Sequence, residues 1–190
     1  MSSIAFRGYD ELISLLDAAA SQPSVEERVR RVERDLCLLI KSGAIELPES
    51  FRQPDGQRYA RRLLHKSDDP KYTALIMVWG PGQGTPLHDH AGIWCVEGVM
   101  EGQIDVVQYE LLEEKNGLCR FERRTLERAG VGATGCLIPP FEYHTILNAD
   151  PESSSITIHV YGGEMTECNV FMPRDDGWHA RETRPLAYTD

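Results

Sequence analysis

The chain has 190 residues, of which 41% are hydrophobic and 26% are charged, and 30 acidic against 20 basic side chains give a formal net charge of −10. It holds no apolar run near the roughly 18 residues that a membrane-spanning helix needs, and its acidic balance opposes binding to phosphates or anionic lipid. We therefore expect a soluble protein of one domain, residues 1–190, with neither nucleic acid nor a membrane as partner.

Helical patterns occupy the first third of the chain. Apolar residues recur on one face over Tyr9–Ala20, which predicts a short first helix. Ser24, followed three residues later by Glu27, predicts a capping box, and apolar residues at helical spacing continue until Gly43 ends the second helix. A further short helix is predicted over Gln57–Leu64.

From Tyr72 onwards the segments are short and rich in β-formers, and clusters of Gly, Pro, Asn and Asp separate them. This texture is typical of an all-β sandwich or barrel. The fold class is therefore predicted to be mainly β, with a helical part over about 1–66, a β-barrel over about 70–172 and an irregular tail at 173–190. The expected strands cover residues 72–79, 93–100, 103–111, 117–125, 135–138, 143–148 and 155–161.

Five cysteines are scattered along the chain, and their odd number and irregular spacing do not indicate a disulfide framework. The N-terminus shows no basic stretch followed by an apolar core and a cleavage site. These features predict a cytoplasmic protein.

Two histidines, His88 and His90, flank Asp89. Because side chains two residues apart in a strand share a face, both imidazoles can converge on one metal ion while Asp89 points away. Neutral imidazoles suit Fe, Cu, Ni or Zn. An isolated pair of this kind also occurs on polar surface strands, so the pair alone does not decide.

The segment Ser155–Tyr161 alternates polar and apolar residues, so that Thr157, His159 and Tyr161 share one face of a strand. In most sheets this would be the solvent face, but in a barrel the same face can line a pocket. The pattern alone leaves both interpretations open.

The spacing around the two histidines resembles the first motif of the cupin superfamily. Gly82, His88, His90 and Gly102 have the cupin spacing, and Cys95 stands where most cupins carry a metal-binding Glu. Residues 139–148 resemble the second cupin motif.

This resemblance implies a cupin (jelly-roll) β-barrel in which His144 lies beside the first two histidines. The implied ligand set is three neutral imidazoles, which could hold hydrolytic zinc or Fe(II) with open positions. A zinc hydrolase would need a general base near the metal, and Asp89 faces the wrong way.

Two further segments resemble the thiol dioxygenases within that superfamily, and among them the cysteine dioxygenases of bacterial type. Residues 59–64 carry a Tyr-x-Arg-x-Leu pattern, which implies that Arg61, with Tyr59 beside it, binds the substrate carboxylate. The segment around His159 matches a Ser-x-His-x-Tyr pattern, with Thr157 in place of Ser. This match implies that His159 orients the hydroxyl of Tyr161 and that Thr157 supports His159.

Arg61 has a neighbour that could take its place, because Arg62 follows it directly. Helical spacing would separate the two by roughly 100 degrees, so only one should face the pocket, and a solvated helix face remains the alternative. The family pattern favours Arg61. A guanidinium suits the task because its fork binds a carboxylate through two parallel hydrogen bonds.

The resemblance implies a non-haem Fe(II) enzyme of cysteine catabolism that adds both atoms of O₂ to a small thiol and releases a sulfinate. The preferred substrate is L-cysteine, whose thiolate and amine would occupy two open iron positions. A 3-mercaptopropionate dioxygenase is the nearest alternative, although residues 162–170 lack the arginine that such relatives carry beyond the tyrosine. A non-catalytic cupin that senses a thiol or a metal is a third interpretation, which His159 and Tyr161 oppose. The sequence does not indicate an oligomeric state.

Cys95 falls where the mammalian relatives carry a cysteine that cross-links to the tyrosine matching Tyr161. Simple alternation from His90 would turn Cys95 away from the metal. A bulge or turn at residues 91–93 would bring Cys95 back to the face that carries His90. The alternative is a free, buried thiol.

Overall fold

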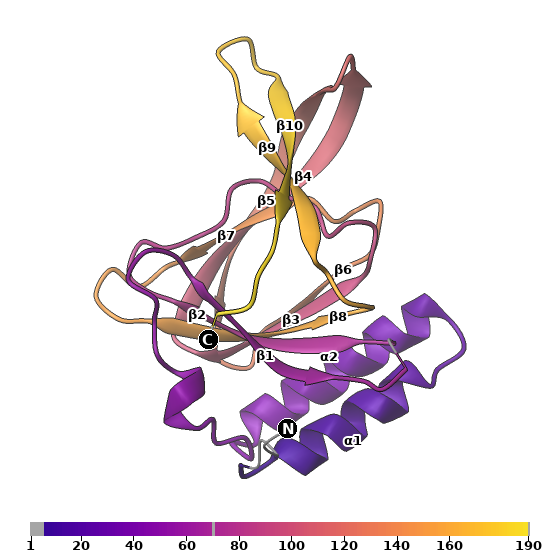
Figure 1. The fold of residues 1–190 in the computed structure, drawn as a ribbon, viewed down its shortest axis with the longest axis vertical. Helices are drawn as coiled ribbons and strands as arrows, with labels where there is room; N and C mark the ends of the chain where they lie inside the picture. The colour runs from indigo at the N-terminus through magenta and orange to yellow at the C-terminus, as the bar shows by residue number, and fades with distance from the viewer. Residues whose placement is uncertain (1–5, 70, 190) are drawn as a thin grey trace.

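A computed structural model describes residues 6–69 and 71–189. Two helices, α1 (Tyr9–Ala20) and α2 (Val25–Lys41), lie together on one side of two antiparallel β-sheets (Figure 1). A one-turn 3₁₀ helix at Glu49–Phe51 follows them. The mainly β fold class with a helical N-terminal segment, which the sequence predicts, is confirmed.

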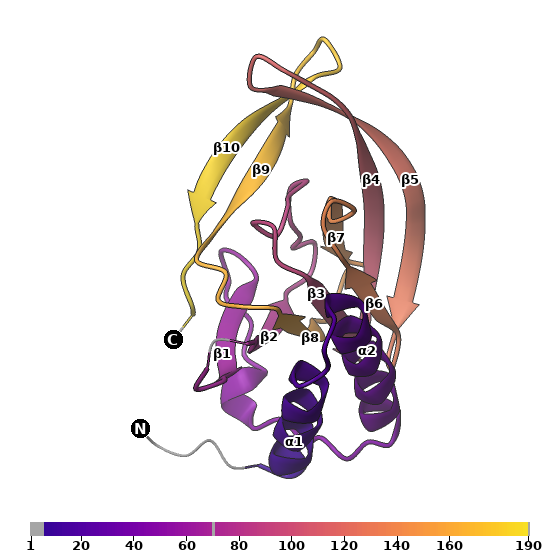
Figure 2. The same ribbon diagram turned by 90° about the vertical axis from the view of Figure 1, so that its right-hand side faces the viewer.

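Each sheet has five strands among the described residues. The first sheet has the order β1 (Ala60–Lys66), β2 (Thr73–Trp79), β8 (Ser155–Tyr161), β3 (Cys95–Glu101) and β6 (Thr134–Leu137). The second has the order β7 (His144–Asn148), β4 (Gln103–Lys115), β5 (Leu118–Gly130), β10 (His179–Pro185) and β9 (Glu167–Pro173). The β4–β5 and β9–β10 hairpins project away from the helices and meet near their tips (Figure 2), where β10 pairs with β5.

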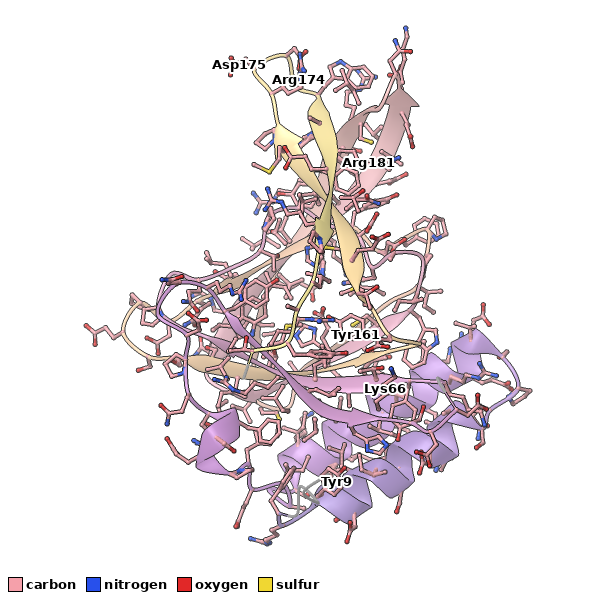
Figure 3. The ribbon with its side chains drawn as sticks, viewed as in Figure 1. Tyr9, Lys66, Tyr161, Arg174, Asp175 and Arg181 are labelled. Carbon is pink, nitrogen blue, oxygen red and sulfur yellow. The ribbon has the colours of Figure 1, made fainter. Side chains whose placement is uncertain are left out.

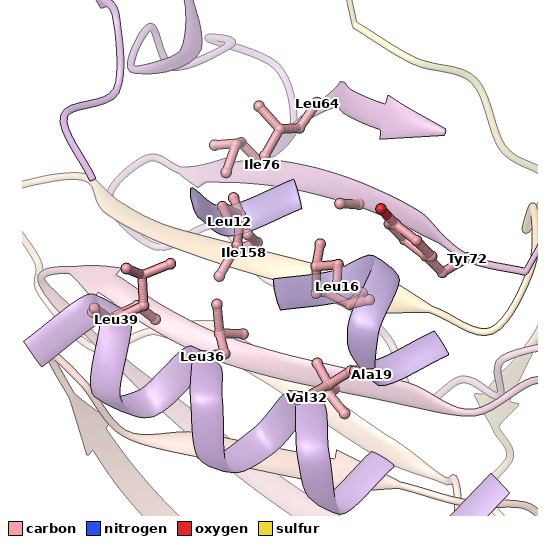
Figure 4. Close-up of a cluster of buried hydrophobic side chains, with 14 of the residues drawn as sticks. Leu12, Leu16, Ala19, Val32, Leu36, Leu39, Leu64, Tyr72, Ile76 and Ile158 are labelled. Atoms are coloured by element: carbon pink, nitrogen blue, oxygen red, sulfur yellow. The ribbon is translucent and has the colours of Figure 1, made fainter. Parts of the chain in front are cut away.

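The helices cover the outer face of the first sheet. The hydroxyl of Ser24 accepts a hydrogen bond from the backbone N–H of Glu27, whose carboxylate accepts one in return, as the capping-box pattern predicts. Apolar side chains of both helices, including Leu36, pack on Ile76 and Ile158 of the sheet (Figure 4). Helix α2 comes close to β3 because Gly98 has no side chain: a Cβ there would lie 2.8 Å from a methyl carbon of α2.

Strand alternation gives this sheet two different faces. In β8, Ile156, Ile158 and Val160 join the apolar core under the helices. Thr157, His159 and Tyr161 point the other way, into the space between the two sheets, and all are buried. Their polar face therefore lines the interior and not the solvent, which decides between the two interpretations that the sequence leaves open.

The predicted helix over Gln57–Leu64 is wrong. Residues 60–66 form β1, which pairs antiparallel with β2 along its length. Adjacent side chains of a strand point to opposite faces, so Arg61 and Arg62 are separated by about 180 degrees and not by about 100 degrees. Neighbours of Arg62 in the strand, Ala60 and Leu64, pack under the helices, so Arg61 is the arginine that faces the interior.

The prediction of an irregular tail at 173–190 is also wrong. Residues 179–185 form β10, which pairs with β9 over seven residues. Neither strand was predicted. Strand β10 is solvated on both faces, so its sequence lacks apolar alternation, whereas Cys168, Val170 and Phe171 of β9 are buried. In the described part of the chain, no helix is long and apolar enough to cross a membrane.

We predict that Leu36→Ala lowers the free energy of unfolding by about 2–5 kcal/mol, because Leu36 is fully buried between α2 and the first sheet. Leu38→Ala is the matched control, since Leu38 lies on the same helix and is 62% exposed. It should change the free energy by less than about 0.5 kcal/mol. Urea unfolding of both variants checks this, and equal losses would contradict the packing of α2.

Candidate metal centre

Three histidines converge between the two sheets. One ring nitrogen from each of His88, His90 and His144 lies within 4.8 Å of the others, and all three side chains are buried. His144 begins β7, and its backbone exchanges hydrogen bonds of 3.2 and 3.3 Å with the backbone of His88. Segments more than fifty residues apart in sequence are thus joined directly at the site.

The ring nitrogens are arranged to bind a cation. Nδ1 of His88 lies 3.1 Å from the carbonyl oxygen of Pro86, so it carries the proton and leaves Nε2 with a free lone pair. That Nε2 lies 3.2 Å from Nε2 of His144. Both ring nitrogens of His90 have no hydrogen-bond partner among the described residues, although the side chain is fully buried. Unpaired buried polar atoms are costly, and a metal ion would satisfy them.

Burial keeps these imidazoles neutral. It lowers the pKa of His88, and it lowers the pKa values of His90 and His144 well below the ordinary range, with help from the neighbouring histidines. Neutral imidazole is the form that binds a transition metal. The three residues therefore fit a metal ion, although their role as ligands stays a prediction.

Two carboxylates hold the loop that carries the first two histidines. Asp89 points away from them: its oxygens accept hydrogen bonds of 2.9 and 2.7 Å from the backbone and side-chain nitrogens of Asn169 on β9. Glu142 accepts a 2.7 Å hydrogen bond from the backbone N–H of His90. These contacts orient the ligand loop without contributing to the candidate ligand set.

A hydrogen-bonded row along the inner face of β8 lies beside the histidines. Trp79 Nε1 donates a 2.8 Å hydrogen bond to Oγ1 of Thr157, which lies 2.8 Å from Nε2 of His159. The hydroxyl of Tyr161 lies 3.4 Å from Nδ1 of His159. The rings of Tyr161 and His90 are 5.8 Å apart, and Figure 3 shows Tyr161 in the body of the barrel below the hairpins.

Cys95 faces Tyr161. The two are partners on the adjacent strands β3 and β8, and both are buried. The chain before Cys95 turns through two left-handed residues, Ala91 at φ 54° and Gly92 at φ 76°, which breaks the alternation that runs from His90. Burial raises the pKa of Cys95 well above its ordinary value, so without further influence it is a protonated thiol.

Arg61 carries a buried positive charge into the same interior. Its Nη2 donates a 2.8 Å hydrogen bond to the carbonyl oxygen of Met165, while its Nε has no partner in the described part of the chain. No ion pair with a carboxylate is found for it among the described residues. The guanidinium carbon lies 5.0 Å from the ring centre of Tyr188, and Tyr59 stacks on Trp79 at 4.6 Å.

A narrow cavity connects these groups. Its volume is about 20 Å³, and an adjoining cavity of about 470 Å³ shares Tyr59 and His88 with it. Among the residues that line the narrow cavity are Arg61, Tyr59, His88, His159 and Tyr161. The structure thus brings a guanidinium, the candidate metal ligand His88 and the inner face of β8 to one small space.

Glu97 is a buried residue at the site that the sequence analysis misses. Its Oε1 lies 3.2 Å from Nδ1 of His159 and 3.6 Å from Nε2 of His144. Glu97 follows Cys95 by two residues on β3, so the alternation that brings Cys95 inward brings Glu97 inward as well. That relation could have identified it from sequence.

The family model for Cysteine dioxygenase type I matches residues 25–174 of the chain. Cysteine dioxygenase type 1 of Rattus norvegicus is 23% identical over 121 residues, which cover 63% of this chain and 58% of that protein. The enzyme of the same name from Danio rerio is 22% identical over 126 residues, covering 65% and 61%. The chain thus matches about three fifths of the length of these curated relatives.

Solved structures with barrel domains are also similar. A double-stranded β-helix domain protein of Klebsiella pneumoniae is 17% identical with a TM-score of 0.46, covering 64% of this chain and 91% of that one. A cupin 2 conserved barrel domain protein of Rhodopseudomonas palustris is 15% identical with a TM-score of 0.46, covering 66% and 76%.

We predict that His90→Ala and His144→Ala each weaken binding of a divalent transition metal by at least about tenfold, because each removes one of three converging donors. His179→Ala is the control, since His179 lies on β10 outside the cluster. Metal content after reconstitution, measured by elemental analysis, checks the result. Full occupancy in the His144→Ala variant would contradict the ligand set.

Proposed function

The chain belongs to the cysteine dioxygenase type I family, and from this premise we propose that it is a non-haem Fe(II) thiol dioxygenase. It adds both atoms of O₂ to the sulfur of a small thiol and releases the sulfinate, with L-cysteine as the preferred substrate. The observation that carries the proposal is the buried guanidinium of Arg61, whose Nε has no partner among the described residues and which lines the same narrow cavity as His88 and Tyr161.

His88, His90 and His144 would hold the iron. Three neutral imidazoles suit several transition metals, and the family membership favours Fe(II). When bound, the ion supplies the redox chemistry and a common centre at which substrate sulfur and dioxygen meet in reacting geometry.

Arg61 binds the substrate carboxylate. A buried cation without an ionic partner is costly, so the site favours an anionic group beside it. The hydrogen bond to the carbonyl of Met165 fixes one side of the guanidinium and leaves Nε free to donate. The stacked rings of Tyr59 and Trp79 form an apolar wall next to it, which limits the substrate to a small molecule.

The inner face of β8 positions the hydroxyl of Tyr161. Because Trp79 donates to Oγ1 of Thr157, the hydroxyl hydrogen of Thr157 is free to donate to Nε2 of His159. With Nε2 as the acceptor, Nδ1 of His159 is a donor, and it faces the hydroxyl oxygen of Tyr161 at 3.4 Å and Oε1 of Glu97 at 3.2 Å. This arrangement holds the phenol oxygen beside the metal ligands, where its own hydrogen can be donated to a polar substrate.

3-Mercaptopropionate is the second candidate substrate. None of the described residues that line the narrow cavity carries a carboxylate that could pair with the ammonium group of cysteine. A thiol with a carboxylate and no ammonium group would satisfy Arg61 equally well.

Oxygen uptake by iron-reconstituted protein tests the proposal and separates the candidates. L-Cysteine, 3-mercaptopropionate, cysteamine and homocysteine are compared, and we expect the highest kcat/KM for L-cysteine with one sulfinate formed per O₂ consumed. A higher value for 3-mercaptopropionate would favour the second candidate. Absence of thiol-dependent uptake with all four would contradict a thiol dioxygenase.

We predict that Arg61→Lys lowers kcat/KM by about 5- to 150-fold, which corresponds to about 1–3 kcal/mol, because the charge remains but the bidentate fork is lost. Its iron content should not change. Arg62→Lys is the matched control, because its side chain lies on the opposite face of β1. If Arg62→Lys proves the more sensitive variant, the orientation of β1 side chains is wrong.

We also predict that Cys95 and Tyr161 form a thioether cross-link during turnover with iron and O₂, because they are buried strand partners. Intact-protein mass spectrometry should show a loss of about two hydrogen atoms, and a peptide joining both residues should follow digestion. The Cys95→Ala variant should keep substantial activity and show no such species. An unchanged mass after many turnovers would leave Cys95 as a free thiol and refute the cross-link.

A further inference from the structure

A cavity of about 470 Å³, the outer cavity, adjoins the narrow cavity of the candidate site. Five residues line both cavities: Tyr59, Thr85, His88, Cys168 and Leu186. The narrow cavity, at about 20 Å³, has room for about one water molecule. A ligand that reaches the candidate site and is larger than that therefore extends into the outer cavity.

Two arginines line the outer cavity. Arg58 directly precedes Tyr59 at the start of β1, and Arg184 lies on β10. Arg184 is the strand partner of Cys168 on β9, and partners on antiparallel strands place their side chains on the same face of the sheet. Cys168 is buried and lines both cavities, so strand pairing directs Arg184 to the same side.

The positive charges act on the residues that the two cavities share. Burial raises the pKa of Tyr59, and the charges of Arg61, Arg58 and Arg184 each oppose that rise. Burial also raises the pKa of Cys168 to about 11, and Arg61 and Arg184 again act in the opposite direction. Since such effects weaken with distance, the three guanidiniums lie around one small volume.

No carboxylate inside the cavities balances these cations. None of the described residues that line either cavity is an aspartate or a glutamate. Arg58 lies 4.0 Å from Asp55 and Arg184 lies 3.2 Å from Glu182, but both arginine side chains are exposed, and exposed pairs of this kind contribute little. In a chain with a net charge of −10, these two cavities are thus a local region of positive potential, which favours anions.

The arginines are divided between the two cavities. Arg61 lines the narrow cavity, whereas Arg58 and Arg184 line the outer one. A ligand with one carboxylate on Arg61 leaves the outer pair without an anionic partner inside the cavity. A second carboxylate on the same ligand, directed outwards past Tyr59 and Cys168, would meet that pair.

We propose that Arg58 and Arg184 form an anion-binding subsite in the outer cavity, which binds the second carboxylate of a ligand whose first carboxylate is held by Arg61. The ligand class is small dicarboxylates. One consequence rests on the proposed function: the substrates of the enzyme extend to thiols that carry two carboxylates.

Calorimetric titration of the iron-reconstituted protein under nitrogen tests the subsite without any thiol or turnover. Succinate and butyrate have the same number of carbon atoms and differ by one carboxylate, so the ratio of their affinities isolates the second anionic group. We expect succinate to bind at least about fivefold more tightly, because it gains charge-assisted hydrogen bonds to the outer guanidiniums. In the double variant Arg58→Gln with Arg184→Gln, the two ligands should bind equally.

A second double variant, Arg120→Gln with Arg124→Gln, is the matched control. It removes the same two positive charges from the β4–β5 hairpin, where Arg120 is ion-paired with Glu113 and Arg124 with Glu110. Neither arginine is among the described residues that line the two cavities. The preference for succinate should keep its wild-type value there. Loss of the preference in both double variants would reduce the effect to net charge and overturn the subsite.

Equal affinity of the wild-type protein for succinate and butyrate would also overturn the proposal, as would a preference that survives in Arg58→Gln with Arg184→Gln. Thermal melting verifies that the variants fold. Should that double variant fail to fold, Arg58→Gln and Arg184→Gln are titrated singly, and each should reduce the preference. A full preference in both single variants overturns the subsite.

Oxygen uptake tests the consequence for substrates separately. Mercaptosuccinate differs from 3-mercaptopropionate by one added carboxylate, so we expect it to have the higher kcat/KM and to lose that advantage in Arg58→Gln with Arg184→Gln. A value no higher than that of 3-mercaptopropionate would refute the extended substrate class. Absence of uptake with either thiol would contradict the dioxygenase, while the succinate titration still decides the subsite, so the two failures are distinguishable.

Discussion

The cost of burying unpaired polar side chains governs the interior between the two sheets. His90 has two ring nitrogens without partners among the described residues, and Arg61 brings a guanidinium without an ionic partner. Apolar side chains would pack there at lower cost, whereas a metal ion and an anion between these groups would compensate them.

Such an interior depends on a separate apolar core that stabilises the fold. This core lies between the outer face of the first sheet and the two helices, and Leu36 of α2 packs against β3 at Gly98. Strands of the first sheet contribute side chains both to this apolar core and to the polar interior, since alternate side chains face opposite ways. In β8, Ile158 packs under the helices while its neighbours Thr157 and His159 serve the polar interior. The helices therefore support the site without contributing a side chain to it.

The backbone sets the geometry of the site in two places. Hydrogen bonds between the chain at His88 and His144 bring two distant segments together, and Asp89 fastens the first of them to β9 through Asn169. The left-handed turn before Cys95 interrupts the alternation that runs from His90, so that Cys95 lies on the inward face of β3. Without that turn, the residues opposite Tyr161 and His159 would be apolar, and the space behind His144 would have no carboxylate.

The sequence by itself determined α1, α2, most strands and the three histidines that converge in the interior, because periodicity and capping are local and the motif spacings resemble those of a known family. It failed at β1 and at the β9–β10 hairpin. Arg61 and Arg62 lie in a strand that is buried on both faces, and β10 is solvated on both faces, so neither segment shows the alternation of a half-buried strand. Only the tertiary structure decided that Arg61 and Arg62 lie on opposite faces of a strand and that Cys95 and Glu97 face the candidate metal centre. Both depend on strand pairing and on the turn at Ala91, which are set by contacts between segments far apart in the chain.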